Sequence, residues 1–116
     1  MDCTGECLCT EINQRRASKG KAKLRIIGSG ALKNCAKKEA HKNRDESDLD
    51  HYFPGCFGGT SASIVGMSSG CNAMVNAWMN SGRHKVIILD GTWDKMAGSC
   101  CSGDGFEWGA VFFATD

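Results

Sequence analysis

The first half of the chain contains two stretches in which apolar residues recur every three or four positions. Leu8, Cys9 and Ile12 share one helical face, so this spacing predicts a helix over residues 8–18 that ends before Gly20. Ser29 is a residue type that caps helices, and it precedes a second apolar stripe with lysines on the opposite face. The members of this stripe are Leu32, Cys35, Ala36 and Ala40. We therefore expect two amphipathic helices joined by a basic loop.

The middle of the chain lacks a sustained period. Residues 45–68 are first acidic, then rich in glycine and serine, and they include Pro54. This composition predicts a long loop anchored by Cys56. Helical spacing returns after Ser68 or Ser69, either of which can cap a third helix that ends at Gly82. Its buried face would consist of Cys71, Met74, Val75, Trp78 and Met79.

The last part of the chain alternates with a period of two. Two such runs, Trp93–Cys101 and Phe106–Phe113, are separated by a segment that contains Asp104-Gly105. Asp-Gly between alternating runs is a strong signal for a β-hairpin. Both faces of the final strand are largely apolar, so helices should cover the sheet on both sides. The pattern predicts an α+β fold of three α-β-α layers around a mainly antiparallel sheet.

Composition adds disulfides to this picture. The 116 residues fit one domain, residues 1–116, and the 15 glycines predict a thin hydrophobic core. An even set of eight cysteines favours an oxidised, secreted protein with four disulfides. The alternative is a zinc site formed by cysteines, but the sequence contains no C-x-x-C, the spacing typical of such sites. Adjacent residues of a strand point to opposite faces, so Cys100 and Cys101 should have different partners. The eight are Cys3, Cys7, Cys9, Cys35, Cys56, Cys71, Cys100 and Cys101.

Charge is unevenly distributed although the formal net charge is only +1. A basic stretch could be a solvated helix end and loop, or it could bind an anionic polymer. This stretch consists of Arg15, Arg16, Lys19, Lys21, Lys23 and Arg25. An acidic stretch follows the second helix. Because the sequence shows neither an apolar run of membrane-spanning length nor a charged-then-apolar leader, we expect a mature, soluble, extracellular form.

Several of these positions, taken in order, resemble the CAP superfamily, which comprises cysteine-rich secretory, antigen and pathogenesis-related proteins with an SCP-like domain. The most specific segment, Ala77–Leu89, is similar to the family's W-x-x-S-P-G-H-R-x-N-I-L, with Gly82 and Arg83 where proline and glycine usually stand. The other matching positions are Ile12-Asn13-x-x-Arg16, Leu24, the trio Leu32, Ala36 and Ala40, then His51, and the terminal strands at Trp93–Gly98 and Glu107–Phe112. The resemblance implies the α-β-α sandwich of that family in a minimal, divergent form.

The resemblance also implies a cleft with two histidines, which map to His51 and His84, and two acidic side chains. Near the family's Gly-Glu-Asn segment this chain has Thr60 and Ser61, so the usual cleft acid is missing. Zn²⁺ could bind the two imidazoles if a carboxylate folded in as a substitute. The candidates are Glu46, Asp48, Asp50 and Glu107. Alternatively, His84 is structural and bonds the end of a helix.

Three functions are compatible with these observations. The family resemblance implies a secreted binding protein that acts as an effector in host interaction or defence. Its partner would be a lipid, a sterol or a protein receptor, and it would not catalyse a reaction. Phe57, Ile64, Val65 and Met67 could line a lipid groove or simply plug the core. A metal-dependent or serine hydrolase could use Ser81 with His84, or Thr60 and Ser61 with His51, although no nucleophile elbow is present. The third function is binding of an anionic polymer through the basic stretch.

Overall fold

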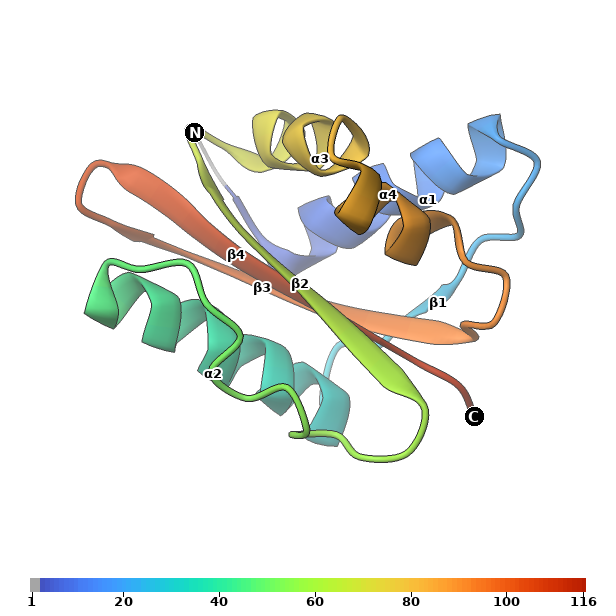
Figure 1. Cartoon of the computed structure of the whole chain (residues 1–116), viewed down its shortest axis with the longest axis horizontal. Coiled ribbons are helices and arrows are strands. Elements are labelled where there is room, and N and C mark those ends of the chain that lie inside the picture. The colour runs from blue at the N-terminus through green and yellow to red at the C-terminus, as the bar shows by residue number, and fades with distance from the viewer. Residues whose placement is uncertain (1–2) are drawn as a thin grey trace.

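A four-stranded sheet lies between helices on both of its faces in the computed structural model, which describes residues 3–116. Helix α2 covers one face, and α1, α3 and α4 cover the other (Figure 1). This arrangement confirms the predicted α-β-α layers. The elements are α1 Gly5–Ser18, β1 Arg25–Ile26, α2 Ala31–Glu46, β2 Ser61–Ser68, α3 Cys71–Met79, α4 Gly82–Leu89, β3 Lys95–Gly103 and β4 Phe106–Ala114.

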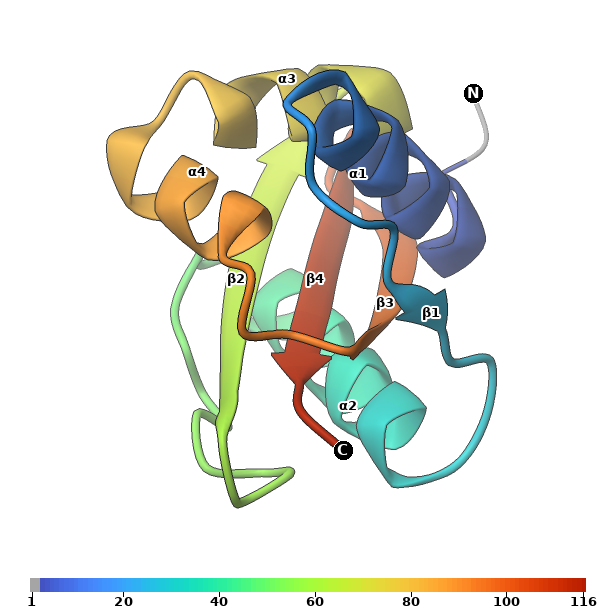
Figure 2. The same cartoon turned by 90° about the vertical axis from the view of Figure 1, so that its right-hand side faces the viewer.

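The predicted hairpin forms the centre of the sheet, whose strand order is β1-β3-β4-β2. Gly103 pairs with Phe106 across the turn, where Asp104 and Gly105 both have positive φ angles of 54° and 79°. Positive φ at both central residues suits a tight two-residue hairpin. β2 is antiparallel to β4, and β1 runs parallel to β3. The mainly antiparallel sheet is therefore confirmed, with β1 and β2 at its edges (Figure 2).

The sheet separates the hydrophobic core into two parts, as the alternation of β4 requires. Val111 and Phe113 are buried on the side of α1, α3 and α4, together with Trp78, which confirms the prediction for that residue. Phe112 packs with Leu32 and Ala36 of α2 on the opposite side. Each face of the central strand is thus covered by helices, which explains why β4 is apolar on both faces.

The helices differ from the predictions mainly at their ends. Helix α1 begins at Gly5 instead of Leu8, because the Thr4 hydroxyl accepts a 3.0 Å hydrogen bond from the Cys7 amide and caps the helix. Glycines rather than serines occupy the N-cap positions of α2 and α3, at Gly30 and Gly70. The segment after Ser81 forms a separate helix, α4, which the helical spacing alone did not predict.

The predicted long loop over residues 45–68 is wrong at both ends. Helix α2 continues to Glu46, and the last eight residues form strand β2. Strand β2 lacks a visible period of two because three consecutive residues of the strand are buried, namely Ile64, Val65 and Gly66. The loop itself covers residues 47–60. The basic loop after α1 likewise contains the short strand β1, which escapes detection because it has only two residues.

Three disulfides are present instead of the expected four. They join Cys3 to Cys100, Cys7 to Cys71 and Cys35 to Cys56. The remaining thiols, Cys9 and Cys101, cannot pair because Cys9 packs on the α1 side of the sheet and Cys101 packs on the α2 side. Cys100 and Cys101 do face opposite sides of β3, as predicted. The disulfides span 97, 64 and 21 residues, and loops of such lengths are each worth about 3–5 kcal/mol in chain entropy.

Candidate functional site

A cleft runs beside the outer edge of β2, between the 47–60 loop and the helices α3 and α4. It consists of two adjoining hollows with volumes of about 350 and 170 Å³. Leu49, Val65 and His84 line both hollows. The larger hollow is further lined by Asp50, His51, Ser63, Ile64, Arg83 and Ile87, and the smaller by Gly66, Met67, Met74, Ala77, Trp78 and Ser81. The cleft is therefore polar at one end and apolar at the other.

The two predicted histidines lie in the larger hollow. His84 is half-buried, and its Nδ1 lies 2.9 Å from the Ser81 hydroxyl; His51 is exposed, and its Nδ1 lies 3.3 Å from the Ser63 hydroxyl. Burial, and then the charges of His51 and Arg83, lower the pKa of His84. His84 is consequently a neutral imidazole at neutral pH. It can exchange a hydrogen bond with a bound molecule without adding a positive charge.

The hydroxyl that meets His51 comes from Ser63, whereas the sequence pointed to Thr60 or Ser61. Thr60 precedes β2, and Ser61 lies two residues before Ser63 on the same strand. Side chains two residues apart in a strand share a face but lie about 7 Å apart, so only one of them reaches the imidazole. Ser81 does meet His84, as the sequence suggested. Because Ser81 is the N-cap of α4 and His84 lies three residues later, this contact also fits a local helix-start arrangement.

The structure brings one of the four candidate carboxylates to the cleft. Asp50 lines the larger hollow, where its Oδ1 accepts a hydrogen bond from the His51 amide. Glu46 instead pairs with Lys42, and Asp48 accepts a hydrogen bond from the Tyr52 hydroxyl. Glu107 lies elsewhere, at the hairpin. Across residues 3–116, neither histidine belongs to a group of three potential ligands within 4.8 Å of one another.

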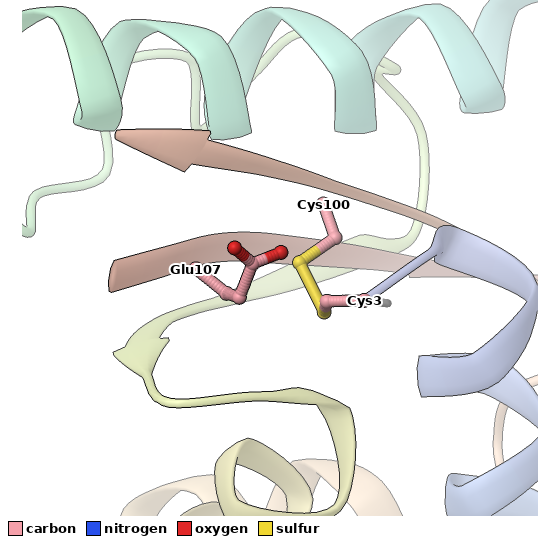
Figure 3. Close-up of side chains that lie close together, drawn as sticks. All are labelled: Cys3, Cys100 and Glu107. Atoms are coloured by element: carbon pink, nitrogen blue, oxygen red, sulfur yellow. A yellow bond between two sulfur atoms is a disulfide. The ribbon is translucent and has the colours of Figure 1, made fainter. Parts of the chain in front are cut away.

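The group that does meet this spacing consists of Cys3, Cys100 and Glu107 (Figure 3). The two sulfur atoms are bonded to each other in a disulfide, so neither is available as the thiolate that a metal ion requires. The Glu107 carboxylate also accepts a hydrogen bond from the Ser102 hydroxyl. The chemistry of this set therefore does not fit Zn²⁺.

A buried carboxylate positions the wall of the cleft. Glu39 on α2 is 0% exposed, and its two oxygens accept hydrogen bonds of 3.0 Å from the amides of Tyr52 and Phe53. Asn43, one turn later, bonds the backbone N–H and C=O of Asp50. These two side chains hold residues 50–53 against α2 and so place His51. Neither residue was predicted from the sequence, although polar residues that continue an apolar helical stripe are a usable signal.

The four apolar candidates divide between the cleft and the core. Ile64 lines the larger hollow but is 0% exposed, and Phe57 packs in the cluster on the α2 side, which supports the core interpretation for these two. Val65 and Met67 line the smaller hollow. Met67 is 38% exposed and Leu49, across the cleft, is 45% exposed. Two large apolar side chains thus meet water at the cleft, which points to a binding surface.

The basic stretch does not form one continuous patch. Arg16 is 2% exposed and donates hydrogen bonds to the carbonyls of Ala22, Ile88 and Asp90. Asn13, the other member of the N-x-x-R motif, bonds the N–H and C=O of Leu24. Both motif residues therefore connect α1 to neighbouring segments. Arg25 forms an ion pair with Asp116, and Arg15 bonds Glu11 and Asn76. The exposed lysines that remain are Lys19, Lys21 and Lys23.

Comparison with known proteins supplies structural likeness alone, since the chain matches neither a family model nor a curated protein. An outer surface protein from Borrelia burgdorferi has a TM-score of 0.79 at 24% identity, over 95% of this chain and 90% of that one. A cysteine-rich secretory protein from Staphylococcus aureus gives 0.72 at 21% identity, over 93% of this chain but 37% of its own length. Schistosoma mansoni venom allergen-like protein 4 gives a TM-score of 0.67 at 10% identity, over 93% of this chain and 83% of that one.

These neighbours have a common character. An extracellular SCP-domain protein from Bacillus anthracis is also similar, with a TM-score of 0.64 at 14% identity over 90% of this chain and 38% of that one. The Borrelia, Staphylococcus and Bacillus proteins are, by name, an outer surface protein, a secretory protein and an extracellular protein. In the described part of this chain, no helix is both long and apolar enough to cross a membrane. Together with the α-β-α layers and the paired cysteines, the likeness shows that this chain has a CAP-like fold, that of the SCP-domain proteins.

Proposed function

We propose that this chain is a secreted binding domain that recognises a lipid, a sterol or a protein partner in the cleft beside β2, without catalysis. The observation that carries the proposal is the pair of exposed apolar side chains, Leu49 and Met67, next to the neutral imidazole of His84. Three disulfides and the extracellular character of the structural neighbours support secretion and a role in host interaction or defence.

The proposal is tested by native mass spectrometry of the oxidised protein with two classes of probe, palmitate and cholesterol on one side and a panel of short peptides on the other. Leu49→Glu places a charge in the cleft and should weaken retention at least tenfold. Phe106→Glu is the matched control, because Phe106 is also 45% exposed but lies at the hairpin, outside the cleft. Equal retention by both variants would place the ligand elsewhere and contradict the proposal.

Hydrolysis is a second candidate function, since the Ser81 hydroxyl lies 2.9 Å from His84. A neutral imidazole can act as a base toward a serine hydroxyl. However, His84 has no carboxylate hydrogen-bonded to it among residues 3–116, so the orienting third group of a triad is missing there. A p-nitrophenyl ester assay separates the two functions: turnover that is lost in both Ser81→Ala and His84→Ala proteins would favour the hydrolase.

Binding of an anionic polymer is a third candidate, carried by Lys19, Lys21 and Lys23. None of these lysines forms an ion pair with another described residue, so their charges are available to a ligand. Binding to heparin that falls steeply with salt concentration, and that is lost when the three lysines become glutamines, would support this function. Salt-insensitive binding would rule it out.

A further inference from the structure

The outer edge of β2 has a definite backbone orientation. In an antiparallel pair, the backbone N–H and C=O groups of successive residues point alternately toward the partner strand and away from it. The Thr115 amide donates a 3.2 Å hydrogen bond to the Thr60 carbonyl, and the β2–β4 register continues from this pair. The backbone N–H and C=O groups of the even-numbered residues of β2 therefore point toward β4. The residues that face away are Ser61, Ser63, Val65 and Met67.

A side chain on α3 supports this orientation. The indole Nε1 of Trp78 donates a 2.9 Å hydrogen bond to the carbonyl of Val65. Val65 is paired with Ala110 of β4 in the register, so its carbonyl would be unavailable to Trp78 if it faced that strand. Trp78 occupies one acceptor at the middle of the outer edge. It leaves the positions on both sides of Val65 unpaired.

Backbone groups along this edge lack partners. Within residues 3–116, the N–H and C=O groups of Ser63 and Met67 and the N–H of Val65 make no hydrogen bond to the protein. An open strand edge is a template onto which another extended segment can pair. The cleft keeps space open at this edge, since Ser63 to Val65 line the larger hollow and Val65 to Met67 line the smaller. Figure 2 shows β2 at the margin of the sheet, with its other side paired to β4.

We infer that the cleft binds an extended peptide segment, which adds a strand to the outer edge of β2. This inference rests on the proposed function and names its partner. The two hollows are centred two residues apart along β2, and two residues is the spacing of side chains that share one face of a strand. A lipid could fill the apolar hollow, but it would leave the edge amides and carbonyls without hydrogen-bond partners.

The lining of the hollows selects the side chains of the peptide. Met67, Met74 and Trp78 form an apolar surface that suits a leucine, methionine or aromatic side chain. Arg83 lines the larger hollow and forms no ion pair with another described residue. Its charge favours an acidic side chain two residues from the apolar one. The expected ligand is thus an extended peptide with an apolar-x-acidic pattern.

The binding test uses fluorescence polarisation with fluorescein-labelled heptapeptides. The probes carry leucine, methionine, phenylalanine or tryptophan at position 3 and aspartate at position 5, and scrambled peptides of the same composition serve as controls. N-methylation of the peptide backbone removes one N–H at a time. Methylation of the alternate N–H groups that face β2 should weaken binding tenfold or more. Methylation of the N–H groups between them should have little effect. Equal effects at all positions would overturn the inference.

Protein variants test the same edge from the other side. Ser63→Pro removes an N–H that faces away from β4, and proline is tolerated at such edge positions. The Ser63→Ala protein loses the hydroxyl but keeps the N–H, so it measures the effect of the side chain alone. Ser63→Pro should bind the peptides at least tenfold more weakly than Ser63→Ala does. If Ser63→Pro loses its cooperative thermal transition, Arg83→Glu replaces it, since Arg83 is exposed. A second set of peptides then carries lysine in place of aspartate at position 5, and Arg83→Glu should bind this set more tightly than the aspartate set.

A lipid arm separates failure of this inference from failure of the proposed function. Palmitate and cholesterol are offered to the same protein preparations. Lipid binding that Leu49→Glu removes, with no binding by any peptide, would overturn the peptide inference and leave the proposed function standing. Absence of binding by both probe classes would overturn both.

Discussion

The guanidinium of Arg16 donates a 2.8 Å hydrogen bond to the carbonyl of Ile88, a residue 72 positions away in the sequence. The same side chain bonds the carbonyls of Asp90 and Ala22. Arg16 therefore holds the end of α4 and the segment after α1 in place. Arg16 has a structural role in this chain, because the side chain is 2% exposed and cannot meet a polymer.

We expect Arg16→Met to lower the free energy of unfolding by about 3 kcal/mol, because three buried or half-buried carbonyls lose a charged donor. Urea unfolding followed by circular dichroism measures the change. Arg15→Met is the matched control: Arg15 is adjacent but partly exposed, and its loss should cost less than about 1 kcal/mol. Equal losses in the two variants would contradict the structural role of Arg16.

Glu39→Gln should loosen the wall of the cleft. The carboxylate accepts from two loop amides and from Asn43, and an amide side chain has one oxygen where the carboxylate has two. We expect a loss of about 2 kcal/mol in the free energy of unfolding. Hydrogen exchange should become faster at Tyr52 and Phe53.

Glu46→Gln is the control for this change, since Glu46 lies on the same helix but pairs with Lys42 at the surface. It should leave both the stability and the exchange rates of the loop nearly unchanged. Faster exchange at Tyr52 in the Glu46 variant, with no change in the Glu39 variant, would contradict the role given to Glu39.

The oxidised protein should retain two thiols. Its mass should lie six hydrogens below that of the reduced protein, which corresponds to the three disulfides. Burial raises the pKa of Cys9 to about 12, and burial also raises the pKa of the half-buried Cys101. Iodoacetamide at pH 8 should therefore label Cys101 before Cys9, and Cys9 only on unfolding.

Peptide mapping after labelling locates the modified residue. The Cys101→Ser protein should take up almost no label in its native state, and the Cys9→Ser protein should label as the wild type does. A mass eight hydrogens below the reduced value would instead show a fourth disulfide and a different arrangement of the sheet and α1.

The pH dependence of stability should report His84. Its pKa lies below the ordinary value of 6.5 in the folded protein, because burial and then the charges of His51 and Arg83 disfavour the protonated form. The unfolded chain therefore binds the proton more tightly. The stability that His84 contributes is fully present above about pH 6.5 and is lost as the pH falls through the folded pKa.

Urea unfolding between pH 7.5 and 5 tests this dependence. His84→Asn should show a flatter decline than the wild type, because the group that takes up the proton on unfolding is gone. His41→Asn is the control, since His41 is exposed on α2 and outside the cleft. A decline that only the His41 change flattens would contradict the role given to His84.

Sequence patterns predicted the architecture better than the ends of its elements. The hairpin was predictable because Asp104-Gly105 and the alternation on either side agree about the same turn. Strand β2 was not, because three consecutive buried residues hide its period, and the helices that cover it are distant in the sequence: Ile64 clusters with Trp78 of α3, and Val65 clusters with Ala40 of α2. The last two residues of α2, Asp45 and Glu46, were predicted as loop because the helical stripe continues beyond Ala40 with a polar residue, Asn43, which is 1% exposed.

The candidate site was only partly predictable for a different reason. Family resemblance placed His51 and His84 in one cleft, and both line the larger hollow. The contact of His51 with Ser63 depends on where β2 begins, and no local pattern determines that point. The absence of a Cys9–Cys101 bond depends on which face of the sheet each thiol meets. Such relationships arise between distant segments, so spacing within a segment does not encode them.

The two longest disulfides have a consequence for proteolysis. Cys3 is joined to Cys100 and Cys7 to Cys71, so every peptide bond between residues 7 and 71 lies inside both covalent rings. Much of the 47–60 loop is exposed and so open to an extracellular protease, and this loop lies within the region. A single cut there would leave both fragments linked, and they would separate on a gel only after reduction. The cleft could therefore survive a nick in its own wall.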